Sequence, residues 1–162
     1  MLKIVTYPQT ILRRSAKEIT DFKAELKTLA TEMAKIMYED DGIGLAAPQV
    51  SISQRLVVIG QKDGKSWQAY VNPEITFFSK DKSVNEEGCL SLPKIYGLVK
   101  RPKKIHLKYQ DLDGIWHKEK IKDFSAIVLQ HEIDHLNGIL FIDRAEKITH
   151  GQEILDELKS KI

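Results

Sequence analysis

The chain has 162 residues, of which 42% are hydrophobic and 30% are charged, a composition typical of a globular protein. Its 25 basic and 23 acidic residues leave a net charge of only +2, which does not predict nucleic acid as the main ligand. No segment reaches the roughly 18 apolar residues that a membrane span needs, and the N-terminus does not resemble a secretory leader. Cys89 is the only cysteine, which excludes an intramolecular disulfide and favours a reducing compartment.

The first predicted element is a helix. Apolar residues recur at helical spacing from Phe22 to Met37, which predicts an amphipathic helix of about four turns. Thr20 or Asp21 is placed to cap its start, and the glycine-containing segment 41–44 is expected to end it.

The middle of the chain contains short runs that are typical of antiparallel strands. These runs lie at 55–60, 69–71, 75–78, 96–99, 105–109 and 115–121. Turn formers such as Asn72-Pro73 and the segment 111–114 separate several of them. The sequence therefore predicts an α+β protein with a mostly antiparallel sheet.

Two further helices are predicted near the C-terminus. The first covers 124–137, with Asp123 as its cap and Gly138 just after its end. The second covers 152–162. Because no repeat or linker divides the chain, we expect residues 1–162 to form a single domain.

The strongest chemical signal is HExxH on the second of these three helices. Residues four apart share one helix face, so His131 and His135 can bind the same metal ion while Glu132 faces its water. Chance placement on a solvated face is the alternative. It is disfavoured because Val128, His131, Glu132 and His135 form one stripe beside apolar neighbours, which predicts a buried face.

A catalytic metal site of this kind needs a third protein ligand and an open fourth position. The residues alone leave the third ligand open among Cys89, an acid, His106, His117 and His150. Cys89 lies in an acidic, glycine-containing segment, although an isolated cysteine is often a buried filler. The segment 42–49 contains two glycines but is not a phosphate loop, because the helix precedes it and no Lys-Ser/Thr follows.

Three segments together resemble the signature motifs of peptide deformylases: GIGLAAPQ at 42–49, EGCLS at 87–91 and QHEIDHLNG at 130–138. The resemblance covers nearly the whole chain. It implies a metal-dependent hydrolase that removes the N-terminal formyl group from nascent N-formylmethionyl polypeptides. It also implies mostly antiparallel sheets packed around a central metal-binding helix, with an N-terminal helix and a short C-terminal helix.

The resemblance also implies roles for individual residues. The metal ligands would be Cys89, His131 and His135, and Glu132 would be the general acid/base. Gln49 and the Leu90 backbone amide would line the oxyanion site. The resemblance implies one divalent cation. Members of the family usually bind Fe²⁺, and Ni²⁺, Co²⁺ or Zn²⁺ can replace it. The ligand chemistry alone would favour zinc.

An extended substrate is expected to add as a strand beside Ile43-Gly44 and the segment near Tyr96-Gly97. The residues expected to contact it are Ile43, Gly44, Glu87, Tyr96, Gly97 and Ile127, with His131 beside the methionine pocket. For the apolar members, ordinary core packing is the alternative. The expected partners are nascent chains and, transiently, the ribosome; we expect a monomer that binds neither DNA nor membranes, in the bacterial cytoplasm or in an organelle after loss of a transit peptide.

Two further expectations concern charge and competing functions. Asp134 is predicted to form a buried pair with Arg101. The basic run 100–104 is expected to be a solvated strand edge, with a ribosomal RNA contact as the alternative. The competing functions are a metallopeptidase, which would cut unformylated peptides, and a binding protein or inactive relative with a closed structural metal site.

Overall fold

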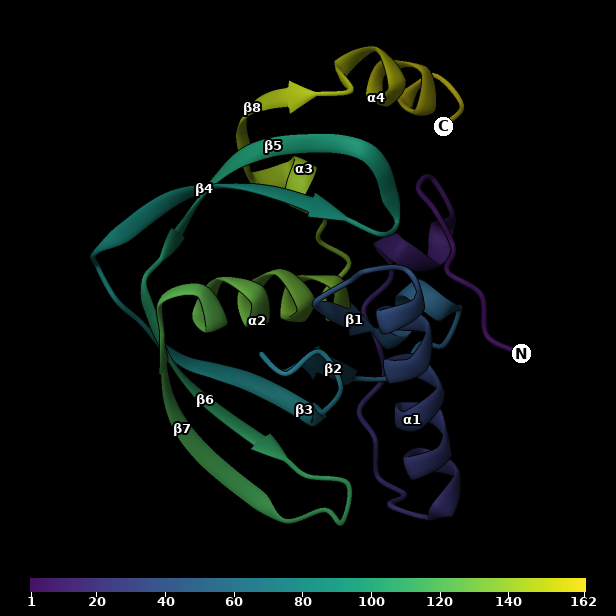
Figure 1. The fold of residues 1–162 in the computed structure, drawn as a ribbon, viewed down its shortest axis with the longest axis vertical. Coiled ribbons are helices and arrows are strands. Elements are labelled where there is room, and N and C mark those ends of the chain that lie inside the picture. Colours follow the sequence, from purple (N-terminus) through teal and green to yellow (C-terminus); the bar gives the residue numbers. More distant parts are fainter.

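The structure is a computed structural model that describes residues 1–162 (Figure 1). The helices are η1 (Thr10–Arg13), α1 (Ala24–Glu39), η2 (Ala47–Val50), α2 (Asp123–Leu136), α3 (Phe141–Arg144) and α4 (Gln152–Lys159). The strands are β1 (Gly44–Ala46), β2 (Leu56–Gly60), β3 (Trp67–Phe78), β4 (Lys82–Cys89), β5 (Leu92–Pro102), β6 (Lys104–Gln110), β7 (Trp116–Lys122) and β8 (Ala145–His150). None of the helices has the length and apolar character that a membrane crossing needs.

The strands form two antiparallel sheets, and α2 lies between them (Figure 1). One sheet has the order β1-β2-β3-β6-β7, and the other has the order β4-β5-β8. This arrangement confirms the predicted α+β class, with mostly antiparallel sheets around a central helix, an N-terminal helix and a short C-terminal helix.

Three apolar clusters hold the layers together. The first packs α1 against one face of β1, β2 and β3, and the second packs α2 against the opposite face. The third lies between the β4-β5-β8 sheet, η1, α3 and α4. As a result α2 has one side on the large sheet and another side turned to β4 and β5, which positions it for a site between the sheets.

The predicted turn at Asn72-Pro73 is wrong, because both residues lie inside β3. Asn72 has a positive φ of 49° at a bulge, where the register with β6 shifts. Its side chain accepts a hydrogen bond from the Ile19 N–H and donates to the Ile19 carbonyl and to Gln110 Oε1. These bonds satisfy the irregular backbone, so the strand continues through a sequence that usually turns.

The predicted helix caps are also wrong. Helix α1 begins at Ala24 after Lys23, and α2 begins at Asp123 itself, which has a φ of 57°. Neither helix has a side-chain cap. The predicted end of α2 is confirmed, since Gly138 follows the helix with a φ of 73°, and a Cβ there would lie 2.5 Å from the Arg13 carbonyl oxygen.

Candidate metal centre and active site

Three segments that are distant in sequence meet on the face of α2 that is turned away from the large sheet. The end of β4 brings Cys89, η2 brings Gln49, and α2 itself brings two histidines and Glu132. Cys89 leaves the regular ladder, because the pairing of β4 with β5 shifts between Gly88 and Cys89. Such an irregularity redirects a side chain at the end of a strand.

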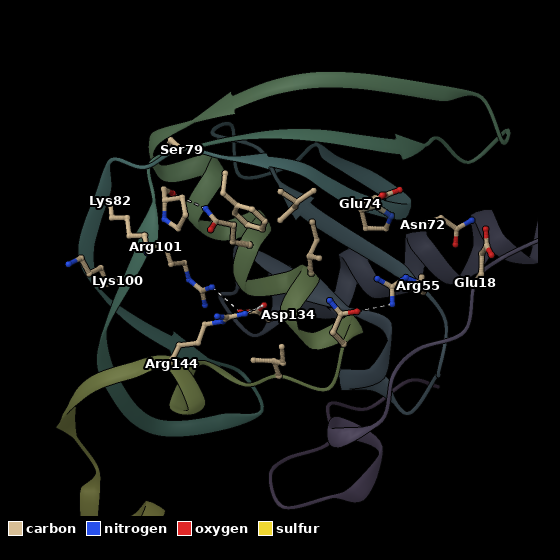
Figure 2. A pocket seen from close by; sticks show the side chains of 18 of the residues that line it. Glu18, Arg55, Asn72, Glu74, Ser79, Lys82, Lys100, Arg101, Asp134 and Arg144 are labelled. Carbon is tan, nitrogen blue, oxygen red and sulfur yellow. Dashed lines mark hydrogen bonds and ion pairs between the residues drawn. The ribbon is translucent and has the colours of Figure 1, made fainter.

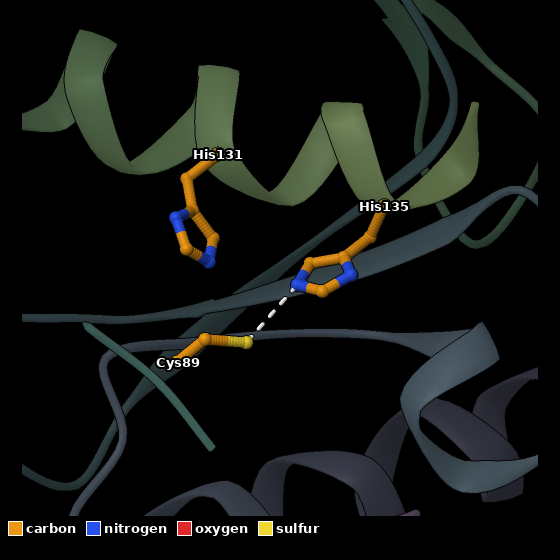
Figure 3. A group of neighbouring side chains, drawn as sticks. All are labelled: Cys89, His131 and His135. Carbon is orange, nitrogen blue, oxygen red and sulfur yellow. Dashed lines mark hydrogen bonds between the residues drawn. The ribbon is translucent and has the colours of Figure 1, made fainter. Parts of the chain in front are cut away.

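The predicted ligand atoms of Cys89, His131 and His135 all lie within 4.8 Å of one another (Figure 3). Cys89 Sγ is 3.3 Å from His135 Nε2. Ligand atoms that share a tetrahedral cation at about 2.0–2.3 Å are themselves about 3.5 Å apart, so the spacing fits a common ion. A thiolate with two imidazoles suits a transition-metal cation, and three protein ligands leave one position for water or substrate.

Glu87 fixes the orientation of the first histidine. Its Oε1 is 2.8 Å from His131 Nδ1, so Nε2 is the ring atom left for a cation. Burial by itself would raise the pKa of Glu87, but the hydrogen bonds with His131 and Arg101 outweigh it and lower the pKa to about 2. Glu87 therefore stays ionised behind the ligand.

The predicted pair between Arg101 and Asp134 is confirmed, and it belongs to a larger buried network. Arg101 donates to Asp134 Oδ2 at 2.9 Å and to the two Glu87 oxygens at 2.6 and 3.0 Å. Arg144 donates to Asp134 at 2.6 and 2.9 Å, as the dashed lines of Figure 2 show. A continuous chain of charge-assisted hydrogen bonds thus runs from Arg144 to the candidate metal ligand His131.

Glu132 is buried beside the ligands, and its Oε1 has no hydrogen-bond partner. A buried oxygen without a partner indicates a place for a water or substrate group. Gly44 makes the room for this carboxylate, because a Cβ there would lie 2.7 Å from Glu132 Oε2. Burial raises the pKa of Glu132 to about 7 in the protein without a cation.

The Gln49 side chain is held in one orientation. Its Oε1 accepts the Ala46 N–H at 2.9 Å, so its amide N–H₂ faces Ser91 Oγ at 3.2 Å and Cys89 Sγ at 3.5 Å. Leu90 occupies the turn between β4 and β5, directly after Cys89. Ser91 was not predicted as a site residue, although it lies in the second motif.

A cavity of about 730 Å³ opens onto Cys89 and His131, two of the three candidate ligands. It is lined by Cys89, His131, Glu132, Gln49 and Leu90, and by the expected substrate residues Ile43, Gly44, Glu87, Tyr96 and Ile127. Ile43 and Tyr96 are 52% and 43% exposed at its mouth, so they are available to a ligand. Phe124, 67% exposed at the start of α2, also lines it and was not predicted, because an exposed aromatic residue carries no pattern of its own.

Gly97 does not line this cavity. It lies in β5, the middle strand of its sheet, and pairs with Glu87 on one side and Ile148 on the other. A peptide therefore has no free edge beside Tyr96-Gly97, and the expectation of a strand added there is corrected. In contrast, β1 is an edge strand that pairs only with β2, so a peptide can pair with its free edge next to Ile43-Gly44.

The other candidate ligands lie away from the cluster. The His106 ring lies against Phe77 in a tilted arrangement, and His117 pairs with Asp111 at 2.7 Å. His150 is on β8, near Tyr96. None of the three joins the group that could hold an ion.

A second cavity, of about 880 Å³, is lined by other residues of α2, among them Gln130, Ile133 and Asp134 (Figure 2). Arg101, Asp134 and Arg144 line it, but none of the three metal-ligating candidates does. The basic run 100–104 adjoins it and is not uniformly solvated, because Arg101 is only 3% exposed. Although this cavity is larger, it lacks the groups that metal-dependent hydrolysis needs.

The model of the polypeptide deformylase family matches residues 1–150. A peptide deformylase from Desulfotalea psychrophila is 45% identical in an alignment of 152 positions that covers 91% of this chain and 89% of that protein. The chloroplastic peptide deformylase 1B of Solanum lycopersicum is 43% identical in an alignment of 164 positions that covers 99% of this chain and 57% of that protein. The crystal structure of peptide deformylase from Thermotoga maritima superimposes with a TM-score of 0.86 at 44% identity, covering 90% of this chain and 98% of that one. The chain belongs to the polypeptide deformylase family.

Proposed function

We propose that Cys89, His131 and His135 hold one divalent cation in this chain and that Glu132, Gln49 and Leu90 carry out the hydrolysis. As a polypeptide deformylase, the protein is a metal-dependent hydrolase that removes the N-terminal formyl group from nascent polypeptides. The observation that carries the residue assignment is the open, three-ligand cluster with the buried, unpartnered Glu132 Oε1 beside it.

The cation, when bound, lowers the pKa of a water towards about 7 and polarises the formyl oxygen. Glu132 takes the proton from the attacking water and later gives it to the leaving amine, so that formate and a free N-terminus result. The fixed amide of Gln49 and the Leu90 N–H donate to the negative charge that develops on the formyl oxygen.

The backbone of β1 and the walls of the cavity position the substrate. An extended chain can add to the free edge at Ile43-Gly44, which selects no particular sequence. Ile127, Glu87 and Tyr96 then surround the first side chain. Backbone recognition suits an enzyme whose substrates share only formylmethionine.

The cation bound in the cell is proposed to be Fe²⁺, which is the usual cation of the family, and Ni²⁺, Co²⁺ or Zn²⁺ are proposed to be able to replace it. The chain is further proposed to act as one catalytic domain over residues 1–162 and as a monomer, in transient contact with the ribosome. In support, one chain supplies all three ligands and Glu132, and segments from residues 43 to 135 build a single site. Relatives from bacteria and from a chloroplast support the bacterial cytoplasm or an organelle as its compartment.

The test is formate release from formyl-Met-Ala-Ser by anaerobically purified protein, with metal analysis of the same samples. Glu132→Gln should abolish turnover and keep the cation, whereas Glu153→Gln, an exposed position on α4, should change neither. Release of alanyl-serine from unformylated Met-Ala-Ser would instead support the metallopeptidase. If the metal-loaded parent releases no formate, the proposed roles fail.

A further inference from the structure

The β6–β7 hairpin carries its positive charge on one face. Ile105, Leu107 and Tyr109 of β6 are buried in the cluster that contains α2, so the residues between them point to the opposite, outer face. The register pairs these outward residues with alternate residues of β7: Lys104 with Lys122, His106 with Lys120, and Lys108 with Lys118. We call these six residues the lysine ladder.

No carboxylate neutralises the lysine ladder. The ion pairs formed by lysines in this structure use Lys23, Lys27, Lys35 and Lys103, none of which belongs to the ladder. Glu74 faces Lys108 across β3 and β6 without forming an ion pair. The five lysines and Glu74 give this face a charge of +4, and since the whole chain carries +2, the rest of the molecule carries −2. The charge is therefore strongly one-sided.

Protection of the sheet edge does not explain the ladder by itself. β7 is the edge strand of its sheet, and lysines on an edge discourage pairing with another chain. Charges of alternating sign would protect the edge equally well and would stabilise the hairpin. The chain instead places lysine opposite lysine on two rungs, which is destabilising in isolation and favourable when a polyanion lies across them.

Two exposed aromatic rings lie on the same outer face. Trp116 pairs with Gln110, the next outward residue of β6, and is 48% exposed, with Lys108 Nζ 4.5 Å from its ring. Phe77 of β3 pairs with His106 and is 46% exposed, with the two ring centroids 4.5 Å apart. Exposed rings between cationic side chains on a sheet are suited to stack bases while the lysines bind phosphates. An acidic polypeptide would use the lysines but not the rings.

We propose that this outer face of the β6–β7 hairpin binds single-stranded RNA, with phosphates on the lysine ladder and bases on Phe77 and Trp116. RNA is favoured over DNA because cellular RNA offers unpaired loops and ends whose bases can stack on exposed rings, whereas the bases of a DNA duplex are already stacked on one another inside the helix. In Figure 1 the hairpin forms the lower left edge of the molecule. The lysine ladder is on the side of the large sheet away from α2. Trp116 and Glu74 also line the cavity of about 880 Å³, but none of the candidate metal ligands does, so the proposal does not depend on the deformylase reaction.

The test is fluorescence anisotropy of a labelled twelve-nucleotide oligouridine titrated with the metal-loaded protein. Three to five phosphate contacts predict that log K falls with log salt at a slope of roughly −2 to −3.5. Lys118→Glu with Lys120→Glu should weaken binding roughly tenfold or more and reduce the slope. The control, Lys159→Glu with Lys161→Glu, makes the same charge change at exposed positions near the C-terminus and should leave most of the affinity. Unchanged deformylation in both variants shows that each is folded.

Trp116 gives a second, independent readout. Stacking should quench its fluorescence on RNA addition, and Trp116→Phe should remove that quench while keeping most of the affinity. Equal weakening by the two charge-reversal pairs would overturn the proposal, because it would reflect net charge alone. Binding of polyglutamate as tight as that of oligouridine, without the quench, would also overturn it.

Discussion

Arg101→Ala should be among the most destabilising single changes in this protein. The Arg101 side chain is 3% exposed, and its two carboxylate partners, Glu87 and Asp134, are 7% and 11% exposed. Removing the guanidinium leaves both acids buried, with only His131 and Arg144 to compensate them. Removal of one partner from a buried ion pair costs about 3–5 kcal/mol of the free energy of unfolding.

That loss can be measured as a fall in the melting temperature of roughly 6–20 °C, because a chain of this size loses about 2–4 °C per kcal/mol. Arg13→Ala is the matched control, since Arg13 also holds a carboxylate with two hydrogen bonds, but in a pair that is 39% and 37% exposed. An exposed pair contributes about 0–1 kcal/mol, so its melting temperature should fall by about 4 °C at most. Both variants are melted at one cation concentration. Equal falls would refute the argument that burial makes the Arg101 network critical.

Three further changes probe the site itself. Glu87→Gln should weaken cation affinity about 10–100-fold in a chelator competition, because His131 loses its ionised partner. Gln49→Ala should lower kcat by about 10²–10³ while the cation is retained, because one donor to the developing oxyanion is lost. Gly44→Ala should lower both kcat and the melting temperature, because the new Cβ would lie 2.7 Å from Glu132 Oε2 and 2.9 Å from its Cγ and would force this buried side chain to move.

Each of these changes has a contrary result. Unaltered cation affinity in Glu87→Gln would mean that His131 is oriented by packing alone. A Gln49→Ala variant that keeps its kcat would remove Gln49 from the oxyanion site. Full activity in Gly44→Ala would show that the Glu132 carboxylate has room to move.

The sequence predicted the elements whose signal is local. The apolar spacing of α1 and α2 identified both helices, and the alternation of apolar residues in β6 identified that strand. Each of these elements buries one face in a hydrophobic core, so its apolar residues recur at a regular spacing. The interior of β3 was missed because Asn72 is stabilised by Ile19, which is far away in sequence. β8 was missed for a similar reason, since it carries little apolar pattern and depends on pairing with β5.

For the site, the motifs predicted which residues belong to it but not the hydrogen bonds and strand pairings that hold those residues in place. The spacing of His131 and His135 follows from helix geometry, so it could be predicted. The network through Arg144 could not, because α3 and α2 meet only in the folded chain. The pairing of β8 with the second edge of β5, which leaves no place for a peptide at Gly97, likewise could not be predicted, because it forms only in the folded chain.

Cys89 and His135 are 46 residues apart in sequence, so a cation held by both would cross-link the chain in addition to its chemical role. A cation bound by both residues closes this loop as a disulfide would, and tying a loop of that length restricts the unfolded chain by ~4 kcal/mol in the chain-entropy description. The link joins the end of β4 to α2, and hence the small sheet to the helix that packs on the large one. A chain with one cysteine can thus gain a removable cross-link between its two halves, so cation starvation should weaken the fold together with the catalyst.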